Sequence, residues 1–249
     1  AGIDFNKGTT VISWTVSDDN NATTACSVSV TVVDTQSPTI ACPANITKGA
    51  DNNQCSAVTT YAVTASDNCM FTVTQTAGLP SGSAFPVGTT VNGFQVVDMS
   101  GNSANCSFNV TVNDTQLPTI ACPANIVTGT TTGQCSAVVN YTVTASDNCG
   151  GTLTPVLISG PASGSTFPLG TTGPIQWRAT DGAGNSANCS FSVTVNDTQA
   201  PDIVCPANIT VPAMGGGCSA TVNYNVTATD NCGGTITPTL VSGGASGST

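Results

Sequence analysis

Aspartate and cysteine are the residues through which this chain could do chemistry. All 13 acidic residues are aspartate, and the chain has 12 cysteines but only three basic residues and no histidine. General acid–base catalysis most often uses histidine, with glutamate and lysine as common substitutes, so we do not expect an enzyme. What remains is cation binding by carboxylate oxygens and sulfur chemistry by the cysteines.

The cysteines recur at fixed spacing. From Cys26 the intervals are 16, 13, 14 and 37 residues, then 16, 13, 14 and 40, then 16, 13 and 14. An even set at regular spacing in a histidine-free chain is typical of a disulfide framework from an oxidising compartment. A four-cysteine metal site is the rival, but the sequence lacks the close Cys-x₂-Cys pairs that such sites favour.

Four cysteines per repeat allow three connectivities. We favour joining the first two, which are 13 residues apart across an expected hairpin, and joining the last two at one end of the domain. The expected pairs are Cys42–Cys55, Cys69–Cys106, Cys122–Cys135, Cys149–Cys189 and Cys205–Cys218. Cys26 and Cys232 would then pair with cysteines of adjacent copies.

Nine aspartates fall at repeat-equivalent positions, in a linker, before an Asn-Cys pair, or at the start of a turn. If these segments meet at one end of a domain, their carboxylates and an asparagine amide could hold calcium, which takes six to eight oxygen ligands. The candidate sets are Asp34, Asp67, Asn68 and Asp98; Asp114, Asp147, Asn148 and Asp181; and Asp197, Asp230 and Asn231. The sequence favours the simpler alternative, in which Asp and Asn cap turns and no cofactor is required.

These side chains are positioned by an internal repeat. The segment that begins at Asp34 returns at Asp114 and, slightly altered, at Asp197. We therefore expect two complete repeats, flanked by the C-terminal half of one repeat and the N-terminal half of another; the boundaries are 1–35, 36–115, 116–198 and 199–249. A half-sandwich exposes its core and a sheet edge. Either the chain is a window on a longer array, or neighbouring copies complement each other end to end.

Period-two alternation predicts the secondary structure. Apolar and polar residues alternate strictly over 106–112, and the pattern returns at 189–195. Turn residues separate such segments every 8–12 residues or so, which is typical of an immunoglobulin-like fold. We expect an all-β protein built from tandem immunoglobulin-like β-sandwich repeats of about 80 residues, stapled by disulfides. Trp14 and Trp177 fall on inward faces, where core packing is expected rather than sugar stacking.

The composition also limits partners and location. Three basic residues cannot form the positive stripe that nucleic acid requires, and no run approaches the roughly 18 apolar residues of a membrane span. The chain begins without Met or a signal peptide, as a mature product or a piece of one would. Among many Asn-x-Ser/Thr sequons, Asn109 and Asn140 lie on outward strand faces, where a glycan would be tolerated.

The ordered motifs resemble the hyalin repeat (HYR domain). They are Asp-x-x-x-Pro-x-Ile-x-Cys-Pro from Asp34, then Asp-Asn-Cys, Gly-Ser-x-Phe-Pro-x-Gly-Thr-Thr and Asp-x-x-Gly-Asn-x-Ala-x-Cys-Ser-Phe-x-Val-x-Val. The leading half departs from the last motif at 18–22. The resemblance covers essentially the whole chain and implies an immunoglobulin-like fold, an extracellular adhesive or matrix-forming protein, and no catalytic residues.

We therefore expect a secreted or cell-surface structural protein, a segment of a long tandem-repeat fibre or stalk whose partner is itself. The alternative is an adhesin module that binds a surface glycan or protein through its loops. Adhesin loops would vary and carry aromatic residues at one repeat, whereas the loops here are small and nearly identical, which favours the structural role.

Overall fold

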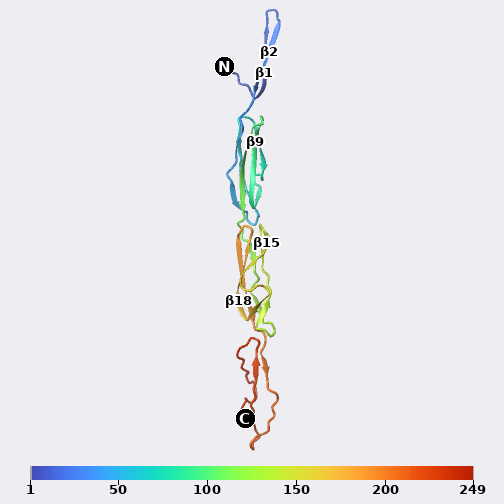
Figure 1. Cartoon of the computed structure of the whole chain (residues 1–249), viewed down its shortest axis with the longest axis vertical. Helices are drawn as coiled ribbons and strands as arrows, with labels where there is room; N and C mark the ends of the chain where they lie inside the picture. The colour runs from blue at the N-terminus through green and yellow to red at the C-terminus, as the bar shows by residue number, and fades with distance from the viewer. Residues whose placement is uncertain (1, 249) are drawn as a thin grey trace. The chain divides into compact units, whose positions relative to one another are not determined.

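The computed structural model describes residues 2–248, and every regular element in that range is a β-strand (Figure 1). The expected all-β fold of disulfide-stapled, immunoglobulin-like sandwich repeats is confirmed. The chain divides into two compact units, Ala1–Gln116 and Leu117–Thr249. Across the described residues, no helix is long and apolar enough to cross a membrane.

The first unit opens with a hairpin of β1 (Gly8–Ser17) and β2 (Thr23–Val32), labelled at the blue end of the chain in Figure 1. The strands are antiparallel, with Trp14 opposite Cys26, and they form a sheet of only two strands. No second layer covers this sheet within the described residues, so Trp14 is 52% exposed. The prediction that Trp14 packs in a core is therefore wrong for this structure.

A complete sandwich follows in the same unit. Its main sheet has the order β4-β10-β9-β7, in which β4 runs parallel to β10 and the other neighbours are antiparallel. Two short antiparallel pairs, β3–β6 and β5–β8, form the opposing layer. The strands are β3 (Thr39–Ala41), β4 (Ile46–Gly49), β5 (Ser56–Val58), β6 (Thr64–Ser66), β7 (Phe71–Ala77), β8 (Ala84–Pro86), β9 (Gly88–Asp98) and β10 (Ser103–Asn113).

Alternation along the long strands builds the core of this sandwich. Phe108, Val110 and Val112 on β10 are buried, whereas the residues between them face outward. Ala57 and Phe85 reach the same cluster from the opposing layer and are fully buried. The two layers are therefore joined by apolar contacts that neither could make alone.

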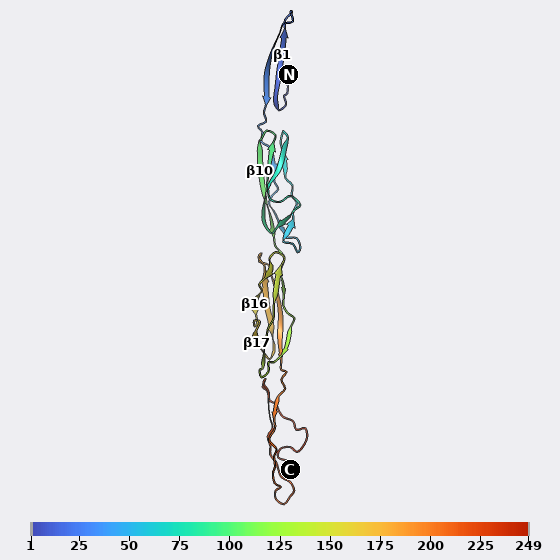
Figure 2. The ribbon, with the colours of Figure 1, turned by 90° about the vertical axis from the view of Figure 1, so that its right-hand side faces the viewer.

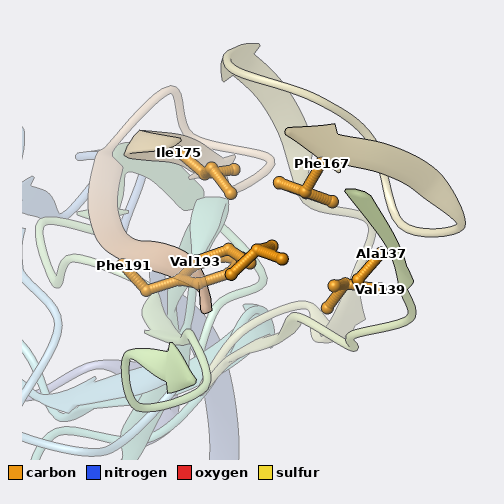
Figure 3. Packing of buried hydrophobic residues seen from close by; sticks show 7 residues of the cluster. Ala137, Val139, Phe167, Ile175, Phe191 and Val193 are labelled. Atoms are coloured by element: carbon orange, nitrogen blue, oxygen red, sulfur yellow. The ribbon is translucent and has the colours of Figure 1, made fainter. Parts of the chain in front are cut away.

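The second unit repeats this plan. Its main sheet is β12-β19-β18-β16, opposed by a β11-β14-β15 sheet and a β13–β17 pair. The strands are β11 (Thr119–Ala121), β12 (Ile126–Gly129), β13 (Ser136–Val139), β14 (Thr144–Asp147), β15 (Gly151–Leu153), β16 (Val156–Ser159), β17 (Ser165–Pro168), β18 (Gly170–Thr180) and β19 (Ser186–Asn196). Figure 3 shows Phe167 and Ile175 pointing toward one another across the core. Trp177 packs against this cluster, as predicted.

The last segment of the second unit is only partly regular. It forms one antiparallel pair, β20 (Asp202–Val204) with β21 (Thr227–Thr229), and continues mainly as irregular chain (Figure 2). One feature of the complete repeats persists, because the Tyr224 hydroxyl donates to the Gly244 carbonyl at 2.6 Å, as the Tyr61 and Tyr141 hydroxyls do to their own loops.

Candidate junction sites

The predicted cation ligands gather where a linker meets the loops of a repeat. We define the first junction as residues 34–36 with the loops at 67–69 and 98–102, all in the first unit. The second junction comprises residues 197–199 with the loops at 131–135 and 230–232, all in the second unit. In both linkers the aspartate Oδ1 accepts the backbone N–H of the glutamine two residues later, at 3.1 Å. This Asx turn aims the carboxylate at the neighbouring loops.

At the first junction, two carboxylates and a thiol converge. Asp34, Asp67 and Cys69 each place one potential ligand atom within 4.8 Å of the others. Asp34 Oδ2 and Asp67 Oδ1 are buried and accept no hydrogen bond from an N–H or O–H group, and the Cys69 thiol, a weak donor, interacts with Asp34. The other oxygen of Asp67 accepts the Cys69 N–H at 3.1 Å. Two buried acceptor oxygens of like charge without a strong donor are costly, and a cation would relieve that cost.

The Cys69 thiol responds to this environment. Its interaction with the Asp34 carboxylate, followed by burial, raises the pKa of the Cys69 thiol above its usual value. A thiol with a raised pKa stays protonated and is a poor metal ligand at neutral pH. The oxygen atoms are therefore the donors that this cluster offers.

Asp98, which the sequence grouped with Asp34 and Asp67, has a different role. Its Oδ1 accepts the N–H groups of Ser100 at 2.7 Å and Asn102 at 2.9 Å, and its Oδ2 accepts the Asn102 side-chain amide at 2.8 Å. Burial opposes ionisation, but these hydrogen bonds outweigh it and hold the pKa of Asp98 below its ordinary value of 3.8. Asp181 makes the same bonds and has a similarly lowered pKa. Turn capping, the simpler alternative, accounts for these two residues.

The capped turn also contacts the linker. Besides bonding Asp98, the Asn102 amide donates to the Asp34 carbonyl at 3.2 Å. Asp98 thus holds Asn102, and Asn102 holds the backbone from which the Asp34 carboxylate projects. Asp98 positions the first junction without belonging to its ligand set.

The second junction repeats the carboxylate pair beside an engaged sulfur. Asp197, Asp230 and Cys232 again place one ligand atom each within 4.8 Å. The Asn231 amide donates to the Gln134 carbonyl at 2.8 Å, and its buried Oδ1 accepts no hydrogen bond. Cys232 is disulfide-bonded to Cys135. The preceding repeat supplies Cys135, so the Cys232 sulfur is already in a disulfide and the donors that remain at this junction are oxygen atoms.

Three further contacts fasten the second junction. The Gln199 side-chain carbonyl accepts the Gly133 N–H at 2.8 Å, which ties the linker to the preceding repeat. Gly129 leaves room for the linker, because a Cβ there would lie 2.6 Å from Thr198 Oγ1. The Cys135–Cys232 bridge spans 97 residues and joins the second complete repeat to the segment after it.

The disulfide connectivity differs from the prediction. The structure joins Cys42 to Cys106 and Cys122 to Cys189, so the predicted Cys42–Cys55, Cys69–Cys106, Cys122–Cys135 and Cys149–Cys189 pairs are wrong. Cys42 follows β3 and faces β10 across the core, at a Cα–Cα distance of 5.7 Å from Cys106. Cys55 lies in a different turn, whose Asn53 N–H bonds Gln116 of the next linker at 2.9 Å.

The other cysteines complete this correction. Cys55 and Cys149, the repeat equivalents of Cys135 and Cys232, are also disulfide-bonded. Cys232 was expected to pair with an adjacent copy and instead pairs within the chain. Cys205 and Cys218, expected to bond each other, are unbonded and exposed, as is Cys26, and Cys69 is unbonded and half-buried.

The remaining predicted residues lie as follows. Asn68 is exposed and Asn140 is exposed, whereas Asn109 on β10 is half-buried. In the other candidate set, Asp114 belongs to the first unit and accepts the Gln116 N–H at 3.1 Å. Asp147 and Asn148 belong to the second unit, where Asp147 is buried and accepts the Cys149 N–H at 2.8 Å.

Sequence reasoning missed the disulfide between repeats and the glutamine and asparagine contacts beside it. A signal was present, because glutamine recurs in each linker at 36, 116 and 199. Its meaning depends on which loop faces the linker, and that arrangement is not local in sequence.

Comparison with known proteins agrees with this architecture. The HYR domain profile matches residues 33–112 and 113–195. The chain is 30% identical over 273 residues to hyalin from Strongylocentrotus purpuratus, covering 92% of this chain and 22% of that protein. It is 34% identical over 177 residues to hyalin from Lytechinus variegatus, covering 68% of this chain and 33% of that protein. The chain thus spans a third or less of either hyalin.

The chain also aligns with solved protocadherin extracellular regions. The protocadherin gammaB7 EC3-6 cis-dimer structure aligns at 15% identity with a TM-score of 0.35, covering 82% of this chain and 62% of that one. The protocadherin gammaB4 extracellular domain aligns at 13% identity with a TM-score of 0.35, covering 90% and 48%.

Proposed function

Because this chain belongs to the HYR domain family, which accounts for residues 33–112 and 113–195, we propose that it is a structural segment of a long extracellular tandem-repeat fibre or stalk. Its role is mechanical. Each sandwich is locked internally by a disulfide, and successive repeats are fastened to one another at their junctions.

The observation that carries the proposal is the Cys135–Cys232 disulfide. It joins one repeat to the next segment rather than closing a single domain. The hydrogen bonds from Asn231 to Gln134 and from Gly133 to Gln199 flank it. Independent binding modules on flexible linkers do not need a covalent bond between neighbouring repeats. In a chain that carries tension, such a bond strengthens the junction.

Composition and sulfur chemistry support the location and the absence of catalysis. Disulfides persist in oxidising, extracellular environments, and this chain has several at repeat-equivalent positions. With no histidine in the sequence, catalysis would depend on aspartate pairs, and the buried pair at the first junction is better explained by cation binding.

Electron microscopy of the native material tests the fibre. The longest strands, β9, β10, β18 and β19, have 11 residues each, or about 36 Å at 3.3 Å per residue. We expect uniform fibres with an axial period of about 35–45 Å, one sandwich plus a linker. Discrete particles without such a period would contradict the proposal.

The junction disulfide can be tested separately by limited proteolysis. In a Cys135→Ser/Cys232→Ser variant we expect proteinase K to cut around residues 197–199 at least tenfold faster than in the parent chain. A Cys26→Ser variant is the matched control, because Cys26 is unbonded and exposed. Equal cleavage rates would mean that the bridge does not restrain the junction.

We further propose that a hard cation such as calcium binds at these junctions. The first junction offers buried oxygens on Asp34 and Asp67 that accept no N–H or O–H hydrogen bond, and the second offers Asp197 and Asp230, with the buried Asn231 Oδ1 next to Asp230 in the chain. Oxygen donors of this kind suit calcium, whereas the nearby sulfur is either disulfide-bonded or has a raised pKa, which disfavours zinc. Bound calcium would neutralise the carboxylate pair and cross-link linker and loop.

Calorimetric titration and thermal unfolding test this site. Calcium at a hundredfold excess over its Kd stabilises a folded state by about 2.7 kcal/mol, and chelation should remove that gain. An Asp34→Asn/Asp67→Asn variant should lose one binding site, whereas Asp19→Asn, in the exposed β1–β2 turn, should keep it. An unfolding temperature that neither calcium nor chelator changes would exclude the site.

A further inference from the structure

The two complete repeats differ in how one edge of the main sheet is built. In the second repeat Gly151 has a φ of 66°, and from it the chain turns back to pair β15 with β14 in the opposing sheet. The chain joins the main sheet only after Pro155, as the four residues of β16. Counted from the Asp-Asn-Cys motif, the first repeat has Phe71 at the position of Gly151. A side chain disfavours positive φ, so the chain continues directly as β7, a seven-residue strand beside β9.

β7 is therefore an edge strand with one unpaired side. The sheet order is β4-β10-β9-β7, so no strand of the described residues pairs with the far side of β7. On the near side, the Met70 carbonyl accepts the Met99 N–H at 3.1 Å. Backbone groups alternate in direction along an antiparallel pair, so the N–H and C=O groups of Phe71, Val73 and Gln75 point away from β9. Such a row of unpaired backbone groups is a template for a further strand.

The other edges of the two main sheets carry features that oppose pairing. β4 and β12 are four residues long, and β4 includes Lys48. β16 is equally short and follows Pro155. Short strands, lysine and proline are the usual means by which edge strands avoid association. β7 has none of these features, although its register shifts between Gln75 and Ala77, so its regular part is 71–75.

The composition of β7 favours a second copy of this chain as the partner. Residues 68–97 contain no charged residue, in a chain whose net charge is −10. Two copies can therefore meet along β7 without placing carboxylates of the two strands opposite each other. Phe71, Thr72, Val73 and Thr74 are of the types that strands favour, and all four are exposed.

Antiparallel pairing of two β7 strands about Val73 fits this edge. A two-fold axis at this point sets Val73 opposite the partner's Val73 and aligns residues 71–75 of both strands, with their free backbone groups facing each other. Thr72 then lies opposite the partner's Thr74, on the sheet face away from the core. A threonine hydroxyl pair of this kind already links β9 to β10, at 3.0 Å.

We propose that β7 is a lateral association site, where the β7 strands of two copies of this chain pair antiparallel and continue the four-stranded sheet across a two-fold axis. The interface is self-complementary, as two-fold contacts are. The inference goes beyond the proposed fibre role: the junctions fasten repeats end to end, whereas β7 joins neighbouring chains side by side. One short strand pair binds weakly, so the first test uses covalent trapping.

Cysteine trapping tests the register. The background chain lacks the four unbonded cysteines, through the changes Cys26→Ser, Cys69→Ser, Cys205→Ser and Cys218→Ser. Thr72→Cys and Thr74→Cys are then made separately, because position 72 faces the partner's position 74 and not itself. Cα atoms of such a cross-strand pair lie about 4.5 Å apart, within disulfide range. With oxidised glutathione, we expect the mixture to form a dimer of twice 24.6 kDa at least tenfold faster than either variant alone.

The matched control is the edge of the second repeat. Val156→Cys and Ile158→Cys are also two residues apart, and the parent side chains are 60% and 49% exposed. Their mixture should form dimers no faster than the separate variants. The proposal would be overturned if the β7 variants dimerised as fast alone as mixed, or no faster than the control. Trapping of Thr72→Cys by Ile158→Cys would place a different strand on this edge and would overturn it as well.

Charge gives a second test that needs no oxidation. Thr72→Lys/Thr74→Lys and Thr72→Asp/Thr74→Asp each place like charges directly opposite one another in the paired strands. In sedimentation equilibrium, each variant should associate at least tenfold more weakly than the parent chain, and their mixture should associate at least as tightly as the parent. Both positions are exposed, so melting temperatures should stay close to that of the parent. A parent chain that is monomeric at millimolar concentration, or a mixture as weak as its components, would contradict the pairing.

Failure of this inference differs from failure of the proposed function. Fibres with the expected axial period but no trapping through β7 would remove the lateral contact and leave the fibre role intact. Trapped β7 dimers in material without an axial period would do the reverse.

Discussion

The β1–β2 hairpin and the β9–β10 pair have the same local structure and very different surroundings. Both are antiparallel and in the same register, and each carries a cross-strand threonine hydroxyl pair at 3.0 Å. In β9–β10 the inward residue Val96 is fully buried, but its counterpart Val16 is 67% exposed. The difference is the opposing layer, which the complete repeat has.

A strand pair can form from local interactions alone, whereas a packed domain needs strands from distant parts of the chain. Alternation, turn capping and cross-strand pairs form the hairpin without help from distant residues. Burial requires strands contributed from elsewhere, and a two-stranded hairpin is marginally stable at best in water. The stability of the complete repeats should therefore depend on long-range contacts, and mutations at equivalent positions in the hairpin should have little effect.

The largest difference in stability between the two regions should come from removing the disulfide inside a sandwich. A Cys42→Ala/Cys106→Ala variant should lower the unfolding free energy of the first complete repeat by about 2–4 kcal/mol, because the 64-residue loop is no longer closed. Cys26→Ala, at the position equivalent to Cys106, should change the stability of the monomer by less than about 0.5 kcal/mol. Urea unfolding followed by circular dichroism measures both, and equal losses would refute the comparison.

Two valines at equivalent positions test the same contrast between the covered and the uncovered strand pair. Val96→Ala removes two buried methyl groups from a fully enclosed side chain and should cost about 2 kcal/mol. Val16→Ala makes the identical change on an exposed face and should cost less than about 0.5 kcal/mol. If Val16→Ala is as costly as Val96→Ala in thermal unfolding of the monomer, then something already covers the hairpin.

Much of the fold could be predicted because it depends on local sequence patterns. Strict alternation placed Phe108 and Val110 in the core and identified the long strands. The convergence of Asp34 with Asp67 also followed from expecting loops and linker at one end of the sandwich. Both inferences need only strand periodicity and a known class of architecture.

The connectivity of the cysteines could not be predicted from spacing, because thirteen residues indicate a hairpin equally well. In the structure β4 lies between Cys42 and Cys55 in the chain. Because β4 runs parallel to β10, toward the linker that follows β10, Cys55 lies away from Cys42. The alternation of side chains along β10 was a better guide to the pairing, because Cys106 lies on the same strand face as Phe108. The Cys135–Cys232 bridge joins positions 97 residues apart and depends on how one repeat meets the next segment.

The smallest expected difference concerns the turn aspartates, and it depends on pH. Asp18 and Asp98 both accept two backbone N–H groups of their own turns, but only Asp98 is buried and also holds the Asn102 amide. Because its folded-state pKa lies below the ordinary value of 3.8, its stabilisation is fully present above that pH and is lost as the pH falls through the lower value. Asp98→Ala should therefore lower the melting temperature at pH 7 more than Asp18→Ala does.

Acid titration of the melting temperature separates charge from hydrogen bonding at Asp98. The gap between the parent chain and Asp98→Ala should narrow below about pH 3.8, as protonation removes the same interactions in the parent. Asp98→Asn retains one acceptor oxygen and no charge, so it should fall between the two at pH 7, and its own contribution should not titrate. A gap that stays constant down to pH 2 would show that Asp98 acts through packing, and the first junction would then owe its geometry to shape rather than to the carboxylate.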